Sequence, residues 1–184
     1  MTRNKPLELY FHIPFCVRKC LYCDFLSGAY DKVMQEAYMK ALLDEVRGRA
    51  GDYSAYEVQT IFIGGGTPSV VDASWINKLL ETVKEHFSMA ADAEISMEVN
   101  PGTVDYEKLL CYRQAGINRL SIGLQSANEE ELKTLGRIHS FEQFQDTYRW
   151  ALQAGFANCN VDVMRAFPGQ SMETYKKTLE AVLS

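Results

Sequence analysis

The cysteines Cys16, Cys20 and Cys23 lie near the N-terminus with the spacing C-x3-C-x2-C. Cysteine thiolates are ligands for soft metal sites such as iron–sulfur clusters and zinc. A cubane [4Fe-4S] cluster is usually held by four thiolates, so three of them leave one iron open. The spacing therefore predicts a cluster at which an external molecule can be bound and reduced.

A zinc site is the alternative interpretation of the same loop, with His12 or Asp24 as the fourth ligand. Structural zinc sites usually take their ligands as two separated pairs, and the sequence has no second Cys/His pair downstream. The total of five cysteines also argues against a disulfide framework. We expect Cys111 and Cys159 to be small buried hydrophobic residues, and we favour the cluster over zinc.

A run of glycines, Gly64, Gly65 and Gly66, is followed by Thr67 and Pro68. Glycines let the backbone approach a ligand closely because no Cβ stands in the way. Pro68 restricts the residue before it to an extended conformation, which fixes the exit of the loop. The alternative interpretation is a tight connection without a ligand.

Polar candidates lie beyond the later predicted strands. An external molecule that the open iron of such a cluster can bind and reduce is S-adenosylmethionine (SAM), which has an amino-acid end, a ribose diol and a sulfonium cation. A carboxylate at a strand end can accept hydrogen bonds from ribose hydroxyls, and an arginine can pair with a carboxylate. The polar candidates are Glu98, Gln125, Arg137 and Asp162. Each has a surface or capping role as its alternative, and the three histidines, His12, His86 and His139, are expected to be structural or surface groups.

Strand-like and helix-like segments alternate along the chain. The expected strands are residues 7–13, 58–63, 94–99, 118–122 and 158–163. The expected helices are residues 31–49, 72–87, 105–115, 129–135, 140–154 and 171–183. Asp72 and Ser140 are expected N-caps, and Gly116 is expected to close the third helix.

This alternation predicts an α/β fold with a parallel sheet and right-handed crossovers. We expect a partial (β/α) barrel with about five of six βα units, whose function gathers on loops at the carboxyl ends of the strands. The cysteine loop, the glycine run and the polar candidates all lie at or just after predicted strand ends.

Composition and charge exclude some classes of function. The 184 residues are 47% hydrophobic and 23% charged, as in a globular domain. The net charge of −5 gives no reason to expect a nucleic-acid surface. No apolar run reaches the length of a membrane span, and the N-terminus lacks the apolar core of a signal peptide. We expect a cytoplasmic protein without nucleic-acid or membrane partners.

Taken together, the motifs resemble a known family. C-x3-C-x2-C is the radical SAM signature, and the surrounding residues resemble the oxygen-independent coproporphyrinogen III oxidase group. The shared motifs are YxHIPFC at 10–16, GGGTPS at 64–69, EVNP at 98–101, SIGLQS at 121–126, LGRIH at 135–139, DVM at 162–164 and PGQ at 168–170. The resemblance covers essentially the whole chain.

The resemblance implies that Cys16, Cys20 and Cys23 hold a [4Fe-4S] cluster. It also implies a set of residues that contact SAM and assigns no separate catalytic residue. The implied SAM contacts are Tyr10, Tyr22, Gly65, Gly66, Thr67, Glu98, Gln125, Arg137 and Asp162.

The resemblance separates two branches of the group by one residue. The dehydrogenase has one more cysteine two residues after the third, and this sequence has Phe25 there. The chain therefore resembles the heme chaperone branch, whose members bind heme and pass it to an acceptor protein. The implied partners are heme, a heme acceptor and an electron donor such as flavodoxin or ferredoxin. The alternative is an oxidase that decarboxylates coproporphyrinogen III to protoporphyrinogen IX, and a non-catalytic heme-binding module and a small zinc protein remain further alternatives.

The sequence departs from the family pattern in two places. Ala166 replaces a usual glycine, so we do not expect a positive φ there. Family members are also considerably longer, so we expect residues 1–184 to be a radical SAM core domain, C-terminally truncated, with the C-terminal domain absent. The acidic balance disfavours a tRNA-modifying member of the superfamily.

Overall fold

The computed structural model describes residues 5–183, and its centre is one parallel sheet. The strands are β1 (Lys5–Ile13), β2 (Tyr56–Gly65), β3 (Ser88–Val99), β4 (Arg119–Gln125) and β5 (Cys159–Val163). All neighbouring pairs are parallel, and the order across the sheet, β1-β2-β3-β4-β5, follows the chain. The predicted alternation and the parallel sheet of a partial barrel are confirmed.

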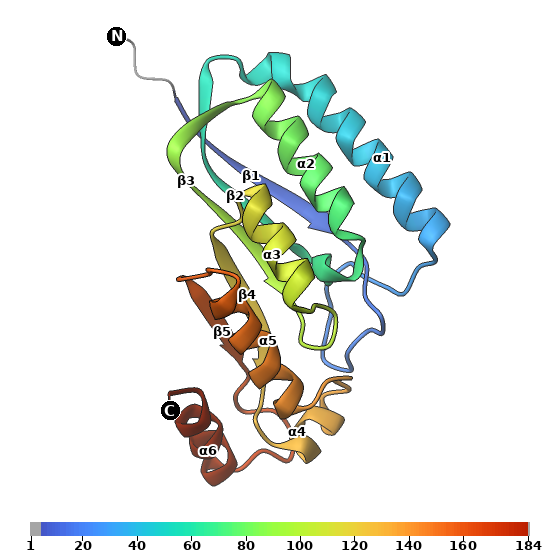
Figure 1. Ribbon diagram of the computed structural model, residues 1–184. Coiled ribbons are helices and arrows are strands. Elements are labelled where there is room, and N and C mark those ends of the chain that lie inside the picture. The colour runs from blue at the N-terminus through green and yellow to red at the C-terminus, as the bar shows by residue number, and fades with distance from the viewer. Residues whose placement is uncertain (1–4, 184) are drawn as a thin grey trace.

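Helices cover one face of this sheet. The helices of the described residues are α1 (Lys32–Arg49), α2 (Ala73–His86), α3 (Tyr106–Ala115), α4 (Glu129–Thr134), α5 (Phe141–Gln153) and α6 (Met172–Leu183). Short 3-10 turns, η1 (Ala50–Tyr53) and η2 (Pro68–Val70), follow α1 and β2. In Figure 1, α1, α2, α3 and α5 lie side by side along the sheet, and each packs against the next.

The two faces of the sheet differ because side chains alternate along each strand. Ile95, Met97 and Val99 of β3 belong to the hydrophobic core that the helices cover. The intervening Glu98 is only partly buried and points to the opposite face. On β4, Leu120, Ile122 and Leu124 are likewise in the core. The helix-free face therefore carries the polar side chains.

Capping residues mark the helix boundaries at the positions that the sequence predicts. The Asp72 carboxylate accepts a 2.9 Å hydrogen bond from the Ser74 backbone amide at the start of α2. Ser140 forms a reciprocal capping box with Gln143 at the start of α5. Gly116 ends α3 with a φ of 110°, a conformation that favours glycine. These predictions are confirmed.

Two backbone features differ from expectation. β3 begins at Ser88 rather than at residue 94, because Ser88 and Met89 pair with β2 ahead of a register shift. Ala166 has a φ of 61°, so the expectation that this position avoids positive φ is wrong. The Ala166 amide donates a 2.7 Å hydrogen bond to the side chain of Gln170, which braces the turn.

A buried carboxylate connects α4 with α6. Glu131 is 6% exposed and accepts hydrogen bonds from Ser126 Oγ at 2.6 Å and from Thr174 Oγ1. Thr178 is the one buried residue of α6. Its hydroxyl shares a hydrogen bond with Ser126 Oγ and accepts a hydrogen bond from the Ala127 backbone amide. These contacts dock α6 against the end of β4 through polar groups.

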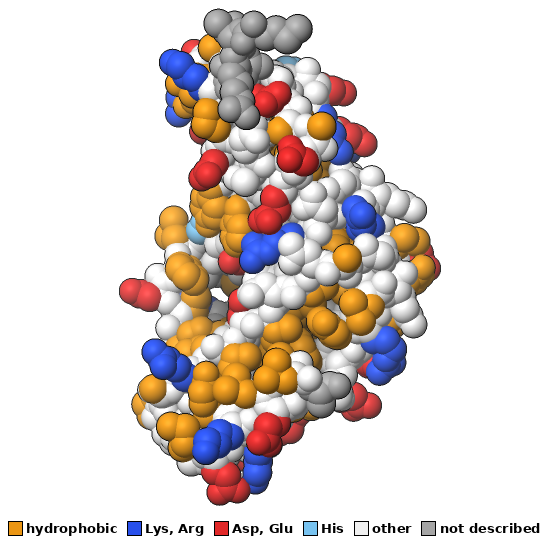
Figure 2. Space-filling view, turned by 90° about the vertical axis from the view of Figure 1, so that its left-hand side faces the viewer, with side chains coloured by type: hydrophobic (Ala, Val, Ile, Leu, Met, Phe, Trp, Pro, Cys, Tyr) orange, Lys and Arg blue, Asp and Glu red, His pale blue; other side chains and the backbone are white. Residues whose placement is uncertain are grey.

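The β5 side of the sheet is less covered than the centre. Within residues 5–183, β5 pairs with β4 alone. Apolar side chains gather in the lower half of the face seen in Figure 2, which includes the end of α6, where Leu183 is 86% exposed. None of the helices described combines the length and apolar character needed to cross a bilayer.

Candidate functional site

The cysteine loop, residues 14–31, connects β1 with α1 and contains no helix or extended strand. Its base is closed by hydrogen bonds from the Cys16 amide to Gly28 O and from the Gly28 amide to Pro14 O, both 2.9 Å. The Leu21 amide reaches across the site and donates a 3.1 Å hydrogen bond to Leu135 O. The loop is therefore fixed at both its base and its tip.

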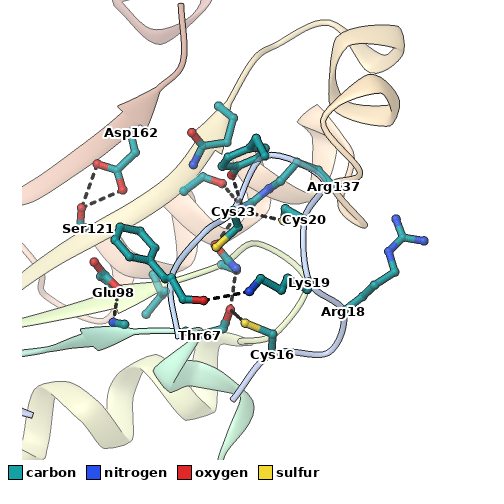
Figure 3. Close-up of a pocket in the computed structure, with 18 of the residues that line it drawn as sticks. Cys16, Arg18, Lys19, Cys20, Cys23, Thr67, Glu98, Ser121, Arg137 and Asp162 are labelled. Carbon is teal, nitrogen blue, oxygen red and sulfur yellow. Dashed lines mark hydrogen bonds between the residues drawn. The ribbon is translucent and has the colours of Figure 1, made fainter. Parts of the chain in front are cut away.

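This loop borders a cavity of about 370 Å³ at the carboxyl ends of the strands, drawn in Figure 3. The cavity collects almost all residues that the sequence singled out. They are Cys16, Cys20, Tyr22, Cys23, Gly65, Gly66, Thr67, Glu98, Gln125, Arg137 and Asp162. The prediction that strand ends bring these side chains together is confirmed, and their roles as ligands stay predictions.

Tyr10 is the exception among the predicted contacts. It is 58% exposed and lies outside this cavity. Its ring stacks on Phe62, and its hydroxyl shares a 2.9 Å hydrogen bond with His12 Nδ1. Burial raises the pKa of this phenol, and the charge of Glu98 adds to the effect.

The three cysteines are free and half-buried, and two receive hydrogen bonds from the surrounding loops. Thr67 Oγ1 donates to Cys16 Sγ at 3.6 Å, and Arg137 Nη1 donates to Cys20 Sγ at 3.7 Å. Across residues 5–183, no group of three or more His, Cys, Asp or Glu side chains is gathered as a preformed metal site. The thiols thus share one cavity without their sulfur atoms being drawn together.

Carboxylates occupy the opposite side of the cavity, as Figure 3 shows. Glu98 Oε2 accepts a 3.0 Å hydrogen bond from the Gly65 amide. Burial raises the pKa of Glu98 despite that hydrogen bond, and the charge of Asp162 raises it further. Asp162 accepts hydrogen bonds from Ser121 Oγ at 3.0 Å and from Asn160 Nδ2 at 2.6 Å. The cavity therefore has an acidic side, and Arg137 and the thiols lie across from it.

The glycine run brings β2 against the cysteine loop. Gly66 N donates to Ile13 O at 2.9 Å, and Thr67 N donates to Phe15 O at 2.7 Å. A Cβ on Gly66 would lie 2.8 Å from both of these carbonyl oxygens. A Cβ on Gly65, whose φ is +110°, would run into the His12 ring. Close contacts within the chain therefore require glycine at these two positions, whether or not a ligand approaches them.

Arg137 connects several walls of the cavity. Its Nη2 donates to Asn100 Oδ1 at 2.8 Å and to Gly123 O at 2.5 Å. Its Nη1 lies 3.4 Å from the hydroxyl of Tyr22. Burial raises the pKa of Tyr22 to about 12, and the nearby Arg137 charge opposes that rise. The buried Nε of Arg137 has no hydrogen-bond partner in the described part of the chain.

Sequence reasoning missed the role of Asn100, which it named only as part of the EVNP motif at 98–101. The Asn100 side chain bonds both Thr67 and Arg137. The available signal was its position two residues after Glu98, because residues i and i+2 of a strand share one face. Gly123 was also missed, and a Cβ there would lie 2.6 Å from Asn100 Oδ1.

Neither proposed fourth ligand of a zinc site faces this cavity. The His12 nitrogens are both engaged, Nδ1 with the Tyr10 hydroxyl at 2.9 Å and Nε2 with Leu26 O at 2.8 Å. Asp24 is exposed and does not line the cavity. The positions of these two side chains therefore weigh against the zinc interpretation.

The remaining histidines and cysteines do not line the cavity of the cysteine loop, although His139 borders a small neighbouring pocket with Cys20 and Arg137. His139 is buried and bonds Leu124 O at 3.2 Å, and burial lowers its pKa to about 4, with Arg137 adding to the effect. His86 is exposed, as expected. Cys111 and Cys159 are half-buried rather than fully buried, and burial raises the pKa of Cys159.

Comparisons with known proteins agree with this geometry. The model of the family described as the Radical SAM superfamily matches residues 10–182. Heme chaperone HemW of Escherichia coli (strain K12) is 45% identical over 174 residues, which cover 94% of this chain and 46% of the relative. HemW of Lactococcus lactis subsp. lactis (strain IL1403) is 36% identical over 180 residues, covering 98% of this chain and 46% of that relative. The chain thus spans about half the length of the curated relatives it matches.

Solved structures give the same fold. The coproporphyrinogen III oxidase HemN from Escherichia coli, described as a radical SAM enzyme, superposes with a TM-score of 0.90 at 33% identity. The match covers 97% of this chain and 42% of that one. The anSMEcpe structure with bound AdoMet has a TM-score of 0.66 at 12% identity, a likeness of fold alone. The fold of a partial (β/α) barrel is confirmed.

Proposed function

The chain belongs to the radical SAM superfamily, and from this premise we propose that it binds a [4Fe-4S] cluster through Cys16, Cys20 and Cys23 and SAM beside it. The observation that carries the proposal is that three free thiols of one loop border the same cavity as Glu98 and Asp162. When bound, such a cluster supplies an electron for the reductive cleavage of SAM. The chain itself supplies the positions, hydrogen bonds and charges around the two groups.

The chemistry of the thiols supports a cluster. Sulfur ligands suit iron–sulfur clusters, and hydrogen bonds to ligand sulfurs are one of the features that set cluster potentials. Thr67 and Arg137 already donate such bonds to Cys16 and Cys20. Phe25, which also borders the cavity, offers no fourth thiol. Three thiols fit a cluster with one iron left for an external ligand.

The opposite side of the cavity supports SAM as that ligand. Glu98 and Asp162 supply carboxylate oxygens that can accept hydrogen bonds from the ribose diol. Arg137 contributes positive charge toward the carboxylate of an amino-acid end, and its buried Nε–H, which has no hydrogen-bond partner among residues 5–183, is a donor whose hydrogen bonding is incomplete. The raised pKa of Glu98 reflects a partly buried carboxylate, and such a group gains from a ligand that donates to it or carries positive charge.

Heme transfer is the finer proposal. It is drawn from relatives that are about twice as long as the region that matches this chain. Two relatives that carry the name heme chaperone support it, at 45% and 36% identity. Phe25, at the position where the resembling oxidase group has an extra cysteine, supports it too. The proposed partners are heme, a heme-acceptor protein and a flavodoxin- or ferredoxin-type electron donor, in the cytoplasm.

Anaerobic reconstitution of the full chain with iron and sulfide tests the cluster. We expect about four irons per chain, a reduced cluster with an electron paramagnetic resonance (EPR) signal, and a change in that signal on adding SAM. Cys20→Ala should lose the signal, and Cys111→Ala should keep it because Cys111 lies outside the cavity. An iron content and spectrum that are equal in the wild type and in Cys20→Ala would contradict the proposal.

Oxidase activity is the second candidate, because the structure of an oxidase superposes over 97% of this chain. Anaerobic incubation of the full protein with coproporphyrinogen III, SAM and a reductant distinguishes the two. We expect no protoporphyrinogen IX, and heme titration followed by absorbance should show a saturable complex. Formation of protoporphyrinogen IX would overturn the preference for the chaperone.

A further inference from the structure

One unbroken series of hydrogen bonds joins two of the three cysteines through a residue that is not a predicted ligand. Thr67 Oγ1 donates to Cys16 Sγ at 3.6 Å and accepts from Asn100 Nδ2 at 2.9 Å. Asn100 Oδ1 accepts from Arg137 Nη2 at 2.8 Å, and Arg137 Nη1 donates to Cys20 Sγ at 3.7 Å. Asn100 lies at the centre of this series, and Cys23 Sγ lies outside it.

The donors and acceptors in this series are consistent at every step. The Thr67 hydroxyl donates its O–H to Cys16 in a hydrogen bond, and its oxygen has lone pairs left to accept from the Asn100 side-chain amide. The Asn100 amide uses its N–H toward Thr67 and its oxygen toward Arg137. Because an amide has both a donor and an acceptor end, asparagine suits a place between a hydroxyl that must accept and a guanidinium that only donates.

The backbone around Asn100 is fixed by further hydrogen bonds. Its amide donates to Ser69 Oγ at 3.3 Å, and its carbonyl accepts from Thr103 Oγ1 at 2.7 Å. The two hydroxyls of Ser69 and Thr103 are bonded to each other at 2.6 Å. Lys108 Nζ donates to Ser69 O at 2.6 Å, which ties α3 to the same group. Asn100 is therefore a fixed point between the loops that carry Thr67 and Arg137.

We propose that Asn100 is a positioning residue that holds Thr67 and Arg137 in place, and thereby sets the hydrogen bonds that the Cys16 and Cys20 sulfurs receive. This inference rests on the proposed function, because it concerns the thiolates as cluster ligands. Hydrogen bonds to ligand sulfurs favour the reduced, more negative state of a cluster and so raise its reduction potential. Removing the Asn100 amide frees both donors, so the potential should fall.

The test compares Asn100→Ala with Asn77→Ala in the full chain after reconstitution. Asn77 is a matched control, because it is also half-buried and its Nδ2 donates to a cysteine sulfur, Cys111 Sγ, at 3.1 Å. Its cysteine lies outside the cavity. The readouts are iron content, the EPR spectrum with and without SAM, and the reduction potential by anaerobic titration.

For Asn100→Ala we expect the redox equilibrium constant to shift at least tenfold toward the oxidised cluster, or ~59 mV for one electron. We also expect an altered EPR spectrum. Asn77→Ala should match the wild type in both. If the wild type holds a cluster and Asn100→Ala has the same reduction potential and EPR spectrum, the inference is overturned and the proposed function stands. If the wild-type chain holds no cluster, the proposed function itself is contradicted.

Circular dichroism would show whether Asn100→Ala folds. If it does not fold, a second pair of variants still tests the inference. Thr67→Val removes the hydroxyl between Asn100 and Cys16, and Thr67→Ser keeps it. We expect Thr67→Val to lower the potential and Thr67→Ser to restore most of the wild-type value. Equal potentials in Thr67→Val, Thr67→Ser and the wild type would overturn the inference.

Discussion

Gly123 of β4 lies directly against the side-chain amide of Asn100 at the end of β3. A Cβ on Gly123 would lie 2.6 Å from Asn100 Oδ1 and 3.0 Å from Arg137 Nη2. The carbonyl of Gly123 also accepts a 2.5 Å hydrogen bond from that Nη2. β4 thus supplies both an acceptor for Arg137 and the space in which Arg137 meets Asn100.

Gly123→Ala should therefore push the Arg137 guanidinium away from Asn100. Overpacking of this kind costs about 1–3 kcal/mol, which urea denaturation of the purified chain would measure. Gly48→Ala is the control, because nothing lies within 4 Å of a Cβ there. It sits on the exposed side of α1 and should raise the free energy of unfolding by ~0.5–1 kcal/mol. Equal stabilities of Gly123→Ala and the wild type would show that the space at Gly123 is not needed.

Gly65→Ala and Gly169→Ala form a second pair, because both glycines have positive φ, +110° and +89°. A non-glycine residue in this region costs roughly 1–2 kcal/mol, so both variants should lose some stability. Only Gly65→Ala also forces the His12 ring to move and disturbs the hydrogen bond from Gly65 to Glu98. Calorimetry should show SAM binding weakened by Gly65→Ala and unaffected by Gly169→Ala. The idea fails if the two variants bind SAM equally well.

Glu131→Gln should loosen α6. The buried Glu131 carboxylate accepts from Ser126, Thr174 and Gln170, and an amide nitrogen would face those donors with a donor. An unmet buried polar group costs about 1–3 kcal/mol. Faster hydrogen exchange in α6 together with a lower unfolding midpoint would support this. Glu130→Gln, whose side chain is 82% exposed, should change stability by less than about 1 kcal/mol.

His139 should make stability depend on pH in the mildly acidic range. Burial lowers its folded-state pKa from 6.5 to about 4, so the fold favours the neutral ring. Stabilisation by the neutral ring is fully present above about pH 6.5 and is lost as the pH falls through about 4. A shift of this size corresponds to about 3 kcal/mol.

Comparing the wild type with His139→Gln isolates this contribution from that of the carboxylates. The free energy of unfolding of the wild type should fall more steeply than that of His139→Gln between pH 6.5 and 4. Parallel pH profiles for the two proteins would show that His139 does not titrate as its burial indicates.

Much of the fold followed from local sequence signals. Asp72 and Ser140 begin their helices, and Gly116 ends its helix, through contacts within a few residues, which is why the sequence alone predicts them. Parallel strands direct their carboxyl ends to one edge of the sheet. This rule was enough to predict that Glu98 and Asp162 lie near the cysteine loop, and both line its cavity.

Other features depend on residues that are distant in sequence, and no local pattern announces them. Asn100 is central only because Thr67 and Arg137 approach it from separate loops. The positive φ of Ala166 is accompanied by a hydrogen bond from its amide to the side chain of Gln170, and residue type alone gave no reason to expect it. The exclusion of Tyr10 from the cavity likewise reflects its pairing with His12 on the face of the sheet.

The cysteine loop also implies an order of events in the life of the protein. The loop has no helix or extended strand of its own, and the donors that reach two of its sulfurs come from the segment after β2 and from the segment after α4. Those donors arrive only when the sheet has assembled. Cys16 and Cys20 therefore receive these hydrogen bonds only in the folded chain, and a chain whose sheet is misassembled would lack them.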